Sequence, residues 1–169
     1  EVGVASTKSF TNQVIILSMM AVWCSQIHNK NGNKRKDFIS GLRNLPYDIK
    51  KTIDNSLEKR DMLVKLLNKP SLFVLGKGKS EAIAKEGSLK IKEITYIHSE
   101  GYSGSALKHG PFALLDKNMP VILVSPENEH YAKMNNAYEE IKSRFAPILF
   151  ITDNKKCKYD NTIIIPKNK

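Results

Sequence analysis

Glutamate, lysine and histidine side chains that could move protons are concentrated in the segment KEGSLKIKEITYIHSEGYSGSALKHGP, from Lys85 to Pro111. If residues 81–97 form a helix, Glu86, Lys90 and Glu93 stand at i, i+4 and i+7 and share one face. Such a stripe can be an exposed row of ion pairs, because Glu86 and Lys90 have the favourable orientation for an i,i+4 pair. In a cleft, the same carboxylate beside an ammonium group could serve as a general base. The spacing leaves both interpretations open.

A histidine follows this helix in a segment rich in Gly and Ser. His109 directly precedes Gly110 and Pro111, so its titratable ring stands on a rigid turn. It can be an ordinary surface histidine. Together with a glutamate and a lysine, however, it would suit proton transfer on a sugar, where one group opens the ring and another carries a proton between adjacent carbons.

Three other catalytic motifs are incomplete in this sequence. The GKGKS run would need a glycine at position 73 to form a phosphate-binding Walker loop, and that residue is Phe73. The GYSGS run resembles a nucleophile elbow but has Ser105 in place of the final glycine. The HSE run at His98 lacks the P-C-x-x-C partner of zinc deaminases. Nucleotide hydrolysis, serine hydrolysis and zinc deamination are therefore not expected.

Composition indicates a globular protein of about one domain, since 41% of the 169 residues are hydrophobic and 26% are charged. The net charge of +10 comes from lysines that are not interleaved with aromatic residues, so we do not expect nucleic-acid binding. Cys24 and Cys157 lie far apart without CxxC spacing, so we expect free thiols and no metal site. The run VIILSMMAVWCSQI is shorter than the roughly 18 residues of a membrane span, and we interpret it as a buried helix.

Four short, almost continuously apolar runs predict buried strands. They are Ser71–Gly78, Pro120–Pro126, Pro147–Asp153 and Asn161–Lys167. The segments after the first and second runs are long enough for crossover helices, and a loop is expected between the first helix and the second strand. On that first helix, the apolar rows opposite the charged stripe are expected to hold Ile83, Leu89, Ile91, Ile94 and Ile97. The pattern is typical of an α/β fold with a doubly wound parallel sheet flanked by helices.

The first 70 residues predict helices and no strand. The first helix has Thr11 or Asn12 as its cap and ends at the Asn31-Gly32 pair. The second covers about 37–67, with a break or kink at Pro46. Because the first helix is apolar on most sides, something must cover it, and we expect that cover to come from a preceding unit of a longer protein.

The runs EGSLKIKEITYIHSE, LKHGP and EVGVASTKSFTNQ resemble the isomerase half of the glucosamine-6-phosphate synthase family, the isomerising glutamine:fructose-6-phosphate aminotransferases. The resemblance implies the end of a first sugar isomerase (SIS) unit at 1–36, a helical connector at 37–69 and a second SIS domain at 70–169. It implies conversion of fructose 6-phosphate to glucosamine 6-phosphate with ammonia that a separate amidotransferase domain takes from glutamine. It also implies a cytoplasmic homodimer or larger assembly with no metal or redox cofactor and no membrane partner.

The resemblance also assigns roles to individual residues. Glu93 matches the base that transfers a proton between C1 and C2, and Lys90 matches a lysine that lines the same site. His109 matches the ring-opening histidine, which reaches into the site of the neighbouring subunit. Val4 and Ser6 match sugar-contacting positions, Val4 through its backbone and Ser6 through its hydroxyl. Ser6 could equally be a capping serine before the first helix.

The sequence departs from the family pattern in two places. Ser105 and Ala106 replace Gly and Glu before LKHGP, and Lys77 replaces Arg between two glycines. The family's phosphate-binding loop and its imine-forming lysine lie outside this sequence, so we expect the segment alone to be inactive. A different sugar-phosphate isomerase or deaminase, and a non-catalytic sugar-phosphate-binding regulatory module, remain alternatives.

Overall fold

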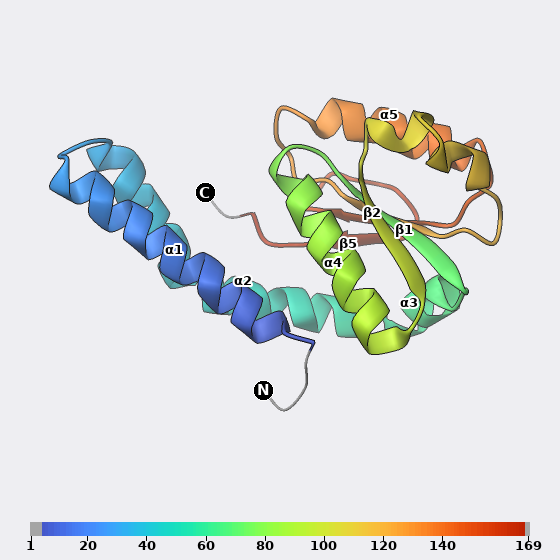
Figure 1. Ribbon diagram of the computed structural model, residues 1–169, viewed down its shortest axis with the longest axis horizontal. Coiled ribbons are helices and arrows are strands. Elements are labelled where there is room, and N and C mark those ends of the chain that lie inside the picture. The colour runs from blue at the N-terminus through green and yellow to red at the C-terminus, as the bar shows by residue number, and fades with distance from the viewer. Residues whose placement is uncertain (1–4, 168–169) are drawn as a thin grey trace.

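The computed structural model describes residues 5–167, which form five helices, two short 3-10 helices and five strands. The helices are α1 (Thr7–Ile27), α2 (Gly32–Leu57), α3 (Arg60–Leu67), α4 (Lys79–Thr95) and α5 (Tyr131–Lys142), with η1 (Ala106–Lys108) and η2 (Pro111–Leu114). The strands are β1 (Ser71–Gly76), β2 (His98–Ser103), β3 (Val121–Val124), β4 (Ile148–Thr152) and β5 (Thr162–Ile164). All strand pairs are parallel, in the order β2-β1-β3-β4-β5 (Figure 1).

Helices cover both faces of this sheet, which confirms the doubly wound α/β fold. On one face, Tyr138 of α5 packs with Phe150 of β4, and on the other, Ala84 of α4 packs with Val74 of β1. Figure 1 shows α5 above the sheet and α3 below it. Because the central strands are buried on both sides, their sequences are apolar without alternation.

The prediction of a loop after α4 is wrong in part, because residues 98–103 form β2, a strand at the edge of the sheet. It pairs with β1 along its whole length, from Ser71 opposite His98 to Gly76 opposite Ser103. The sequence HSEGYS has no apolar run, since an edge strand needs less apolar surface than a central one. The described part of the chain therefore has five strands instead of the expected four.

Helix α4 lies unusually close to β2 because small residues meet at the contact. A Cβ atom on Gly101 would stand 2.5 Å from the Cα atom of Lys85. Nearby, the hydroxyls of Ser88 and Ser99 are hydrogen-bonded at 3.2 Å and buried. This packing fixes where α4 lies and therefore where its outward side chains point.

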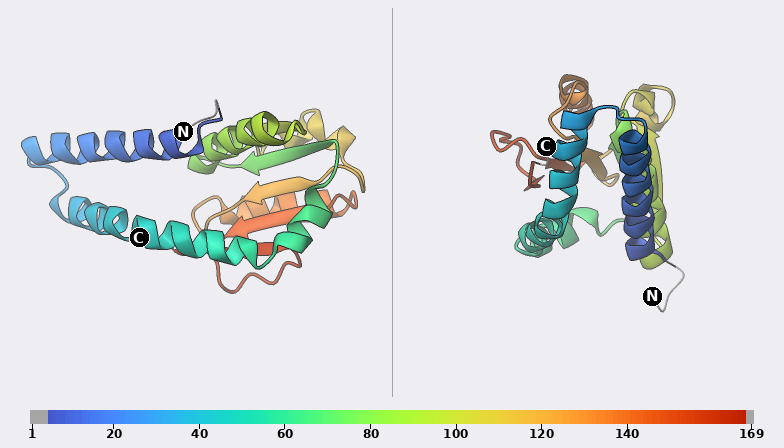
Figure 2. Two further views of the ribbon diagram at one scale, coloured as in Figure 1. Left: turned by 90° about the horizontal axis from the view of Figure 1, so that it is seen from below. Right: turned by 90° about the vertical axis from the view of Figure 1, so that its left-hand side faces the viewer.

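Helices α1 and α2 run side by side and extend away from the sheet (Figure 2). The expectation that the first helix is buried is wrong for the described residues: α1 has no buried side chain, and Trp23 is 62% exposed. The reason is that α2 is its main contact. The helix begins at Thr7, before the expected caps at Thr11 and Asn12. Among residues 5–167, α1 is the helix whose length and apolar composition would allow it to cross a membrane, a test that core helices of large proteins also pass.

Helix α2 continues through Pro46, so the chain does not break there, and the helix ends at Leu57 instead. Near this end, α2 is tied to the last strand of the sheet. The side-chain amide of Asn55 donates to the carbonyl of Ile164 at 2.9 Å, and the ammonium of Lys59 donates to the carbonyl of Thr162. Both cysteines are free thiols, as expected.

Candidate active site

The charged stripe on α4 forms a compact group centred on Lys90. Its Nζ atom lies 2.6 Å from Oε2 of Glu93 and 3.7 Å from Oε1 of Glu86. The Lys90 side chain is only 16% exposed, against 31% for Glu93. The closer partner is the carboxylate at i+3, so the orientation rule that favours Glu86 does not decide the geometry.

The two carboxylates fix the charge of the lysine. The hydrogen bond to Glu93 raises the pKa of Lys90, the charges of Glu93 and Glu86 act in the same direction, and partial loss of water opposes them. The ammonium therefore stays protonated at neutral pH. It is a fixed positive charge beside a carboxylate whose second oxygen can accept a proton.

Large apolar side chains surround this charged group on the outer surface of α4. Ile83, Leu89 and Ile94 are between 42% and 58% exposed, and Tyr96 is 92% exposed. The side chains of α4 that are fully buried against the sheet are small ones: Ser80, Ala84 and Ser88. The expected separation of charged and apolar rows is therefore wrong in part, since Ile83, Leu89 and Ile94 share the outer surface with the ion pairs. Ile91 and Ile97 do pack against the core. A charged pair with an apolar rim is typical of a surface that another part of a protein covers.

His109 lies at the carboxyl end of the strands, opposite the end at which Glu93 stands. It follows η1, beyond the carboxyl end of β2, and its side chain is exposed. Glu93 is in the last turn of α4, which leads into the amino end of β2. The structure therefore brings Lys90 and Glu93 together but keeps His109 away from them within one chain. The neighbouring Lys108 holds this segment against α5 through an ion pair of 2.7 Å with Glu140.

Residues 65–162 match the SIS domain family, and this match covers strands β1 to β4, the first residue of β5, α4, α5 and all three of these side chains. The chain belongs to the SIS domain family. The SIS match begins inside α3, so the α1–α2 pair lies outside it.

Relatives of this SIS domain extend the similarity to nearly the whole chain. It is 50% identical over 155 residues, 90% of the chain, to a probable glutamine–fructose-6-phosphate aminotransferase (isomerizing) of Acanthamoeba polyphaga mimivirus. It is 42% identical over 171 residues, 98% of the chain, to glutamine–fructose-6-phosphate aminotransferase (isomerizing) 2 of Homo sapiens. The chain spans 25% of the length of each of these relatives.

Among solved structures, the C-terminal domain of glucosamine-fructose-6-phosphate aminotransferase from Francisella tularensis has a TM-score of 0.88 with this chain and is 32% identical. The match covers 97% of this chain and 48% of that one. These comparisons confirm the resemblance to the isomerase part of the aminotransferases.

The two sugar-contacting residues expected near the start of the chain are only partly visible. Val4 lies outside the described residues. Ser6 occupies the cap position before α1, but its side chain makes no capping hydrogen bond. The alternative role of Ser6 as a helix cap is therefore not realised, and its hydroxyl is not consumed by the helix end.

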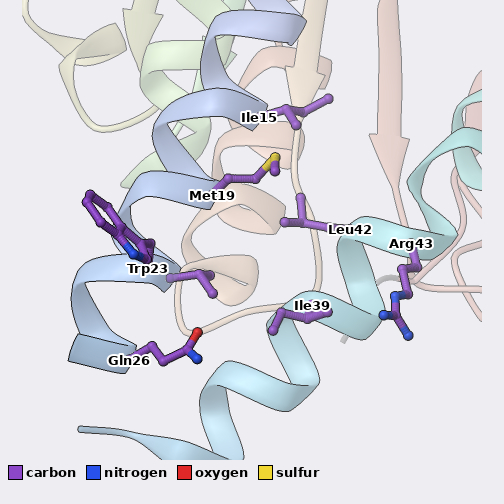
Figure 3. A pocket seen from close by; sticks show the side chains of 8 residues that line it. Ile15, Met19, Trp23, Gln26, Ile39, Leu42 and Arg43 are labelled. Atoms are coloured by element: carbon purple, nitrogen blue, oxygen red, sulfur yellow. The ribbon is translucent and has the colours of Figure 1, made fainter. Parts of the chain in front are cut away.

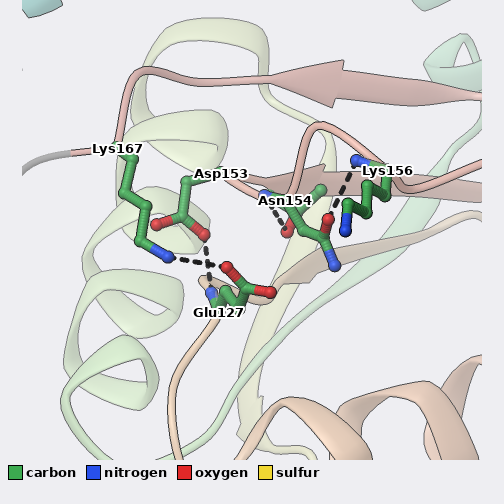
Figure 4. Close-up of polar contacts among 6 residues, drawn as sticks. Glu127, Asp153, Asn154, Lys156 and Lys167 are labelled. Carbon is green, nitrogen blue, oxygen red and sulfur yellow. Dashed lines mark hydrogen bonds and ion pairs between the residues drawn. The ribbon is translucent and has the colours of Figure 1, made fainter.

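Two further features of the molecule do not belong to this charged group. An apolar hollow of about 400 Å³ between α1 and α2 is lined by side chains such as Met19 and Leu42 and contains no carboxylate or histidine (Figure 3). In the SIS domain, the turns after β3 and β4 are tied together, since Asp153 accepts a hydrogen bond from the Glu127 amide and Lys167 pairs with the Glu127 carboxylate, both at 2.6 Å (Figure 4). Within residues 5–167, no three His, Cys, Asp or Glu side chains form a group able to hold a metal ion.

The sequence places Glu86 in the charged stripe but assigns it no role, although it is the second carboxylate within reach of Lys90. The sequence also gives no signal of one contact at the opposite end of the domain. The contact between the Lys77 ammonium and the Ser105 hydroxyl joins the two places where the sequence departs from the family pattern. Those residues are 28 positions apart, and no local spacing signals their contact.

Proposed function

We propose that this chain is the isomerase part of a glutamine:fructose-6-phosphate aminotransferase, which makes glucosamine 6-phosphate from fructose 6-phosphate and glutamine-derived ammonia. The observation that carries the proposal is the 2.6 Å contact between Lys90 and Glu93 on a surface with an apolar rim. The names of the mimivirus and human relatives, which match at least 90% of the chain, support the same reaction.

In this proposal Glu93 is the base of the isomerisation. Once nitrogen is attached to C2 of the open-chain sugar as an imine, the Glu93 carboxylate takes a proton from C1. The electrons of that C–H bond form a C1–C2 double bond, and the π electrons of the C=N bond move to nitrogen, which takes up a proton. Glu93 then delivers its proton to C2 while the C1 hydroxyl loses its proton and becomes the aldehyde. The proton lost from oxygen balances the proton gained by nitrogen, and the oxidation at C1 balances the reduction at C2. No metal or redox cofactor is needed.

Lys90 acts beside Glu93 as a fixed positive charge. Its ammonium stabilises the electron-rich intermediate between the two proton transfers. Glu86 is the second anion of the group and offsets the charge of Lys90. Removal of water by a covering surface would strengthen each of these interactions.

His109 opens the sugar ring in the site of the neighbouring subunit. Within its own chain it lies at the opposite end of the strands from Glu93. This separation favours a homodimer or larger assembly in which the sites are shared. Its exposed turn is available to enter a partner. Ser6, through its hydroxyl, and Val4, through its backbone, contact the sugar.

We further propose that the chain divides into the end of a first SIS unit (1–36), a connector (37–69) and a second SIS domain (70–169). The apolar surface of α1 is then assigned to contact with the first unit instead of lipid, and the protein works in the cytoplasm. Glutamine is handled by a separate amidotransferase domain.

The test is product formation by the full-length protein supplied with fructose 6-phosphate and either glutamine or ammonium. We expect glucosamine 6-phosphate with both nitrogen donors, and none from the 169-residue segment alone. Failure of the full-length protein with both donors would overturn the proposed reaction. Turnover by the isolated segment would overturn the claim that the site needs parts of the protein outside this sequence.

A further inference from the structure

A lysine-rich hollow lies at the carboxyl edge of the sheet, across the domain from Lys90 and Glu93. It measures about 240 Å³ and is bounded by the turn after β1, the turn after β2, η1 and α5. The polar side chains that line it are Lys77, Ser105, Lys108, Lys133, Asn136 and Glu140. In open parallel sheets, crevices outside the carboxyl ends of the strands are the common place for ligands.

The hollow carries a surplus of positive charge. Its one lining carboxylate, Glu140, is already paired with Lys108 at 2.7 Å. The ammonium of Lys77 contacts only the neutral hydroxyl of Ser105 among the residues of the hollow. Lys133 is exposed and has no ion-pair or hydrogen-bond partner within residues 5–167. Three ammonium groups therefore face one carboxylate.

The carboxylate of Glu81, outside the hollow, does not cancel this charge. Glu81, in the first turn of α4, is paired with Lys85 at 2.8 Å. The hydrogen bond from Lys85 lowers the pKa of Glu81 most, and the charge of Lys77 adds a smaller effect in the same direction. The charge of Lys77 thus acts on Glu81, but the main partner of Glu81 is Lys85.

The wall of the hollow is held rigidly. The amide of Gly104 donates to the carbonyl of Gly76 at 2.8 Å, which joins the turns after β1 and β2. A Cβ atom on Gly104 would stand 2.6 Å from the sulfur of Met134, so this turn lies directly against α5. The two turns that carry Lys77 and Ser105 are therefore held in place by backbone and packing contacts.

Charge is distributed unequally along this edge of the sheet. The turn after β3 carries the carboxylate of Glu127, which pairs with Lys167, and the turn after β4 carries Asp153 together with Lys155, Lys156 and Lys158 (Figure 4). Acidic and basic groups are therefore mixed there. The lysine-rich hollow lies on the side of β1 and β2, and its surplus of positive charge would attract an anion that approaches this end of the sheet.

We propose that this hollow binds a small anion through a phosphate group, either inorganic phosphate or the phosphate of a small monoester. Lysine ammonium groups are common phosphate ligands in proteins, and the Ser105 hydroxyl and the Asn136 amide supply further donors. The site is independent of the proposed sugar isomerisation.

The first test is competitive acetylation of lysines in the full-length protein, followed by mass spectrometry of each lysine. The arms are inorganic phosphate, glycerol 3-phosphate and sodium chloride at equal ionic strength. At about ten times the Kd of the phosphate ligand, labelling of Lys77 and Lys133 should fall about tenfold relative to chloride. Lys142, which is on α5 but outside the hollow, should be labelled equally in all arms.

Protection by both phosphate ligands would support a site for the phosphate group itself, and protection by glycerol 3-phosphate alone would assign the site to monoesters. If neither ligand protects Lys77 and Lys133, or if Lys142 is protected equally, the proposal is overturned. As a second measurement, combined Lys77→Gln and Lys133→Gln substitutions should weaken phosphate binding about tenfold, while arginine at both positions should retain it and Lys142→Gln should have no effect. Lys108 also lines the hollow, so phosphate should protect it from acetylation in the native protein. If phosphate protects Lys108 equally well in the double glutamine variant, the site is also rejected.

Discussion

Glu93 and His109 lie at opposite ends of the strands of the parallel sheet. Glu93 comes before the amino end of β2, and His109 lies beyond its carboxyl end. The strand between them has six residues, which corresponds to roughly 20 Å. One sugar molecule cannot contact both groups of the same chain across that separation. If both act in the isomerisation, each complete site must combine Glu93 of one subunit with His109 of another.

Mixed dimers test this sharing. Glu93→Gln and His109→Ala should each be nearly inactive in a homodimer of the full-length protein. In a mixed dimer both lesions fall in one site and the other site is intact, so each mixed dimer should recover up to about half the native rate. The measurement is product formation after subunit exchange. If both groups came from one chain, each site would carry one lesion and no activity would return.

Glu93→Gln by itself should lower isomerisation by roughly 10²–10⁴-fold, because glutamine keeps the shape of the side chain but cannot accept the proton. Sugar binding should survive. The matched control is Glu81→Gln, which removes another lysine-paired carboxylate from the same helix. Transfer of a deuterium label from C1 of the sugar to C2 gives the rate directly. Near-normal transfer in Glu93→Gln would mean that the pair with Lys90 is only a surface ion pair.

Gly101→Ala should destabilise the domain by about 1–3 kcal/mol, because the new Cβ atom would stand 2.5 Å from the backbone of Lys85 and push α4 off β2. Gly87→Ala is the matched control. That glycine is inside α4 with nothing within 4 Å of an added Cβ, so alanine should stabilise the helix by about 0.5–1 kcal/mol. Chemical denaturation of the full-length protein measures both. Similar free energies of unfolding for the two variants would contradict the close packing of α4 on β2.

Alkaline pH should weaken the core next to α5. Burial raises the pKa of Tyr138, and the charges of Asp160 and Glu139 add to this effect. A phenol whose pKa is higher in the folded state stabilises the fold below its unfolded pKa of about 10, and that stabilisation is lost as the pH rises through the folded value. Tyr138→Phe keeps the ring stacked on Tyr159 at 3.6 Å and should flatten the loss of stability above about pH 10. Exposed Tyr96→Phe is the control, and equal pH slopes in the two variants would count against the role of burial.

The central strands could be predicted from the sequence because burial on both faces makes every residue apolar, as in Val121–Val124. The edge strand β2 could not, since its contact with α4 is made by Ser99 and Gly101, whose small size matters only once the helix is in place. The one signal was the alternation of small residues at 99, 101 and 103.

The candidate site could also be predicted from the sequence in part. Helical spacing correctly placed Glu86, Lys90 and Glu93 on one face, because that relation depends on local geometry alone. Spacing could not show that Lys90 lies closer to Glu93, since side-chain rotamers decide that contact. The same spacing puts Ile83, Leu89 and Ile94 beside the stripe, since each lies three or four residues from one of its members, so the expectation that they lie opposite misapplied the helical period. What spacing could not show is that small residues, such as Ser88, are the ones buried beneath α4.

The hydrogen bonds from α2 to β5 determine how this sheet can grow. The carbonyls of Asn161 and Thr152 pair β4 with β5, whereas those of Thr162 and Ile164 point the other way, toward Lys59 and Asn55. An incoming strand would need these outward carbonyls, and both already accept hydrogen bonds from side chains. The β5 edge is therefore protected against edge-to-edge aggregation, and β2 is the side at which a strand from another chain could add.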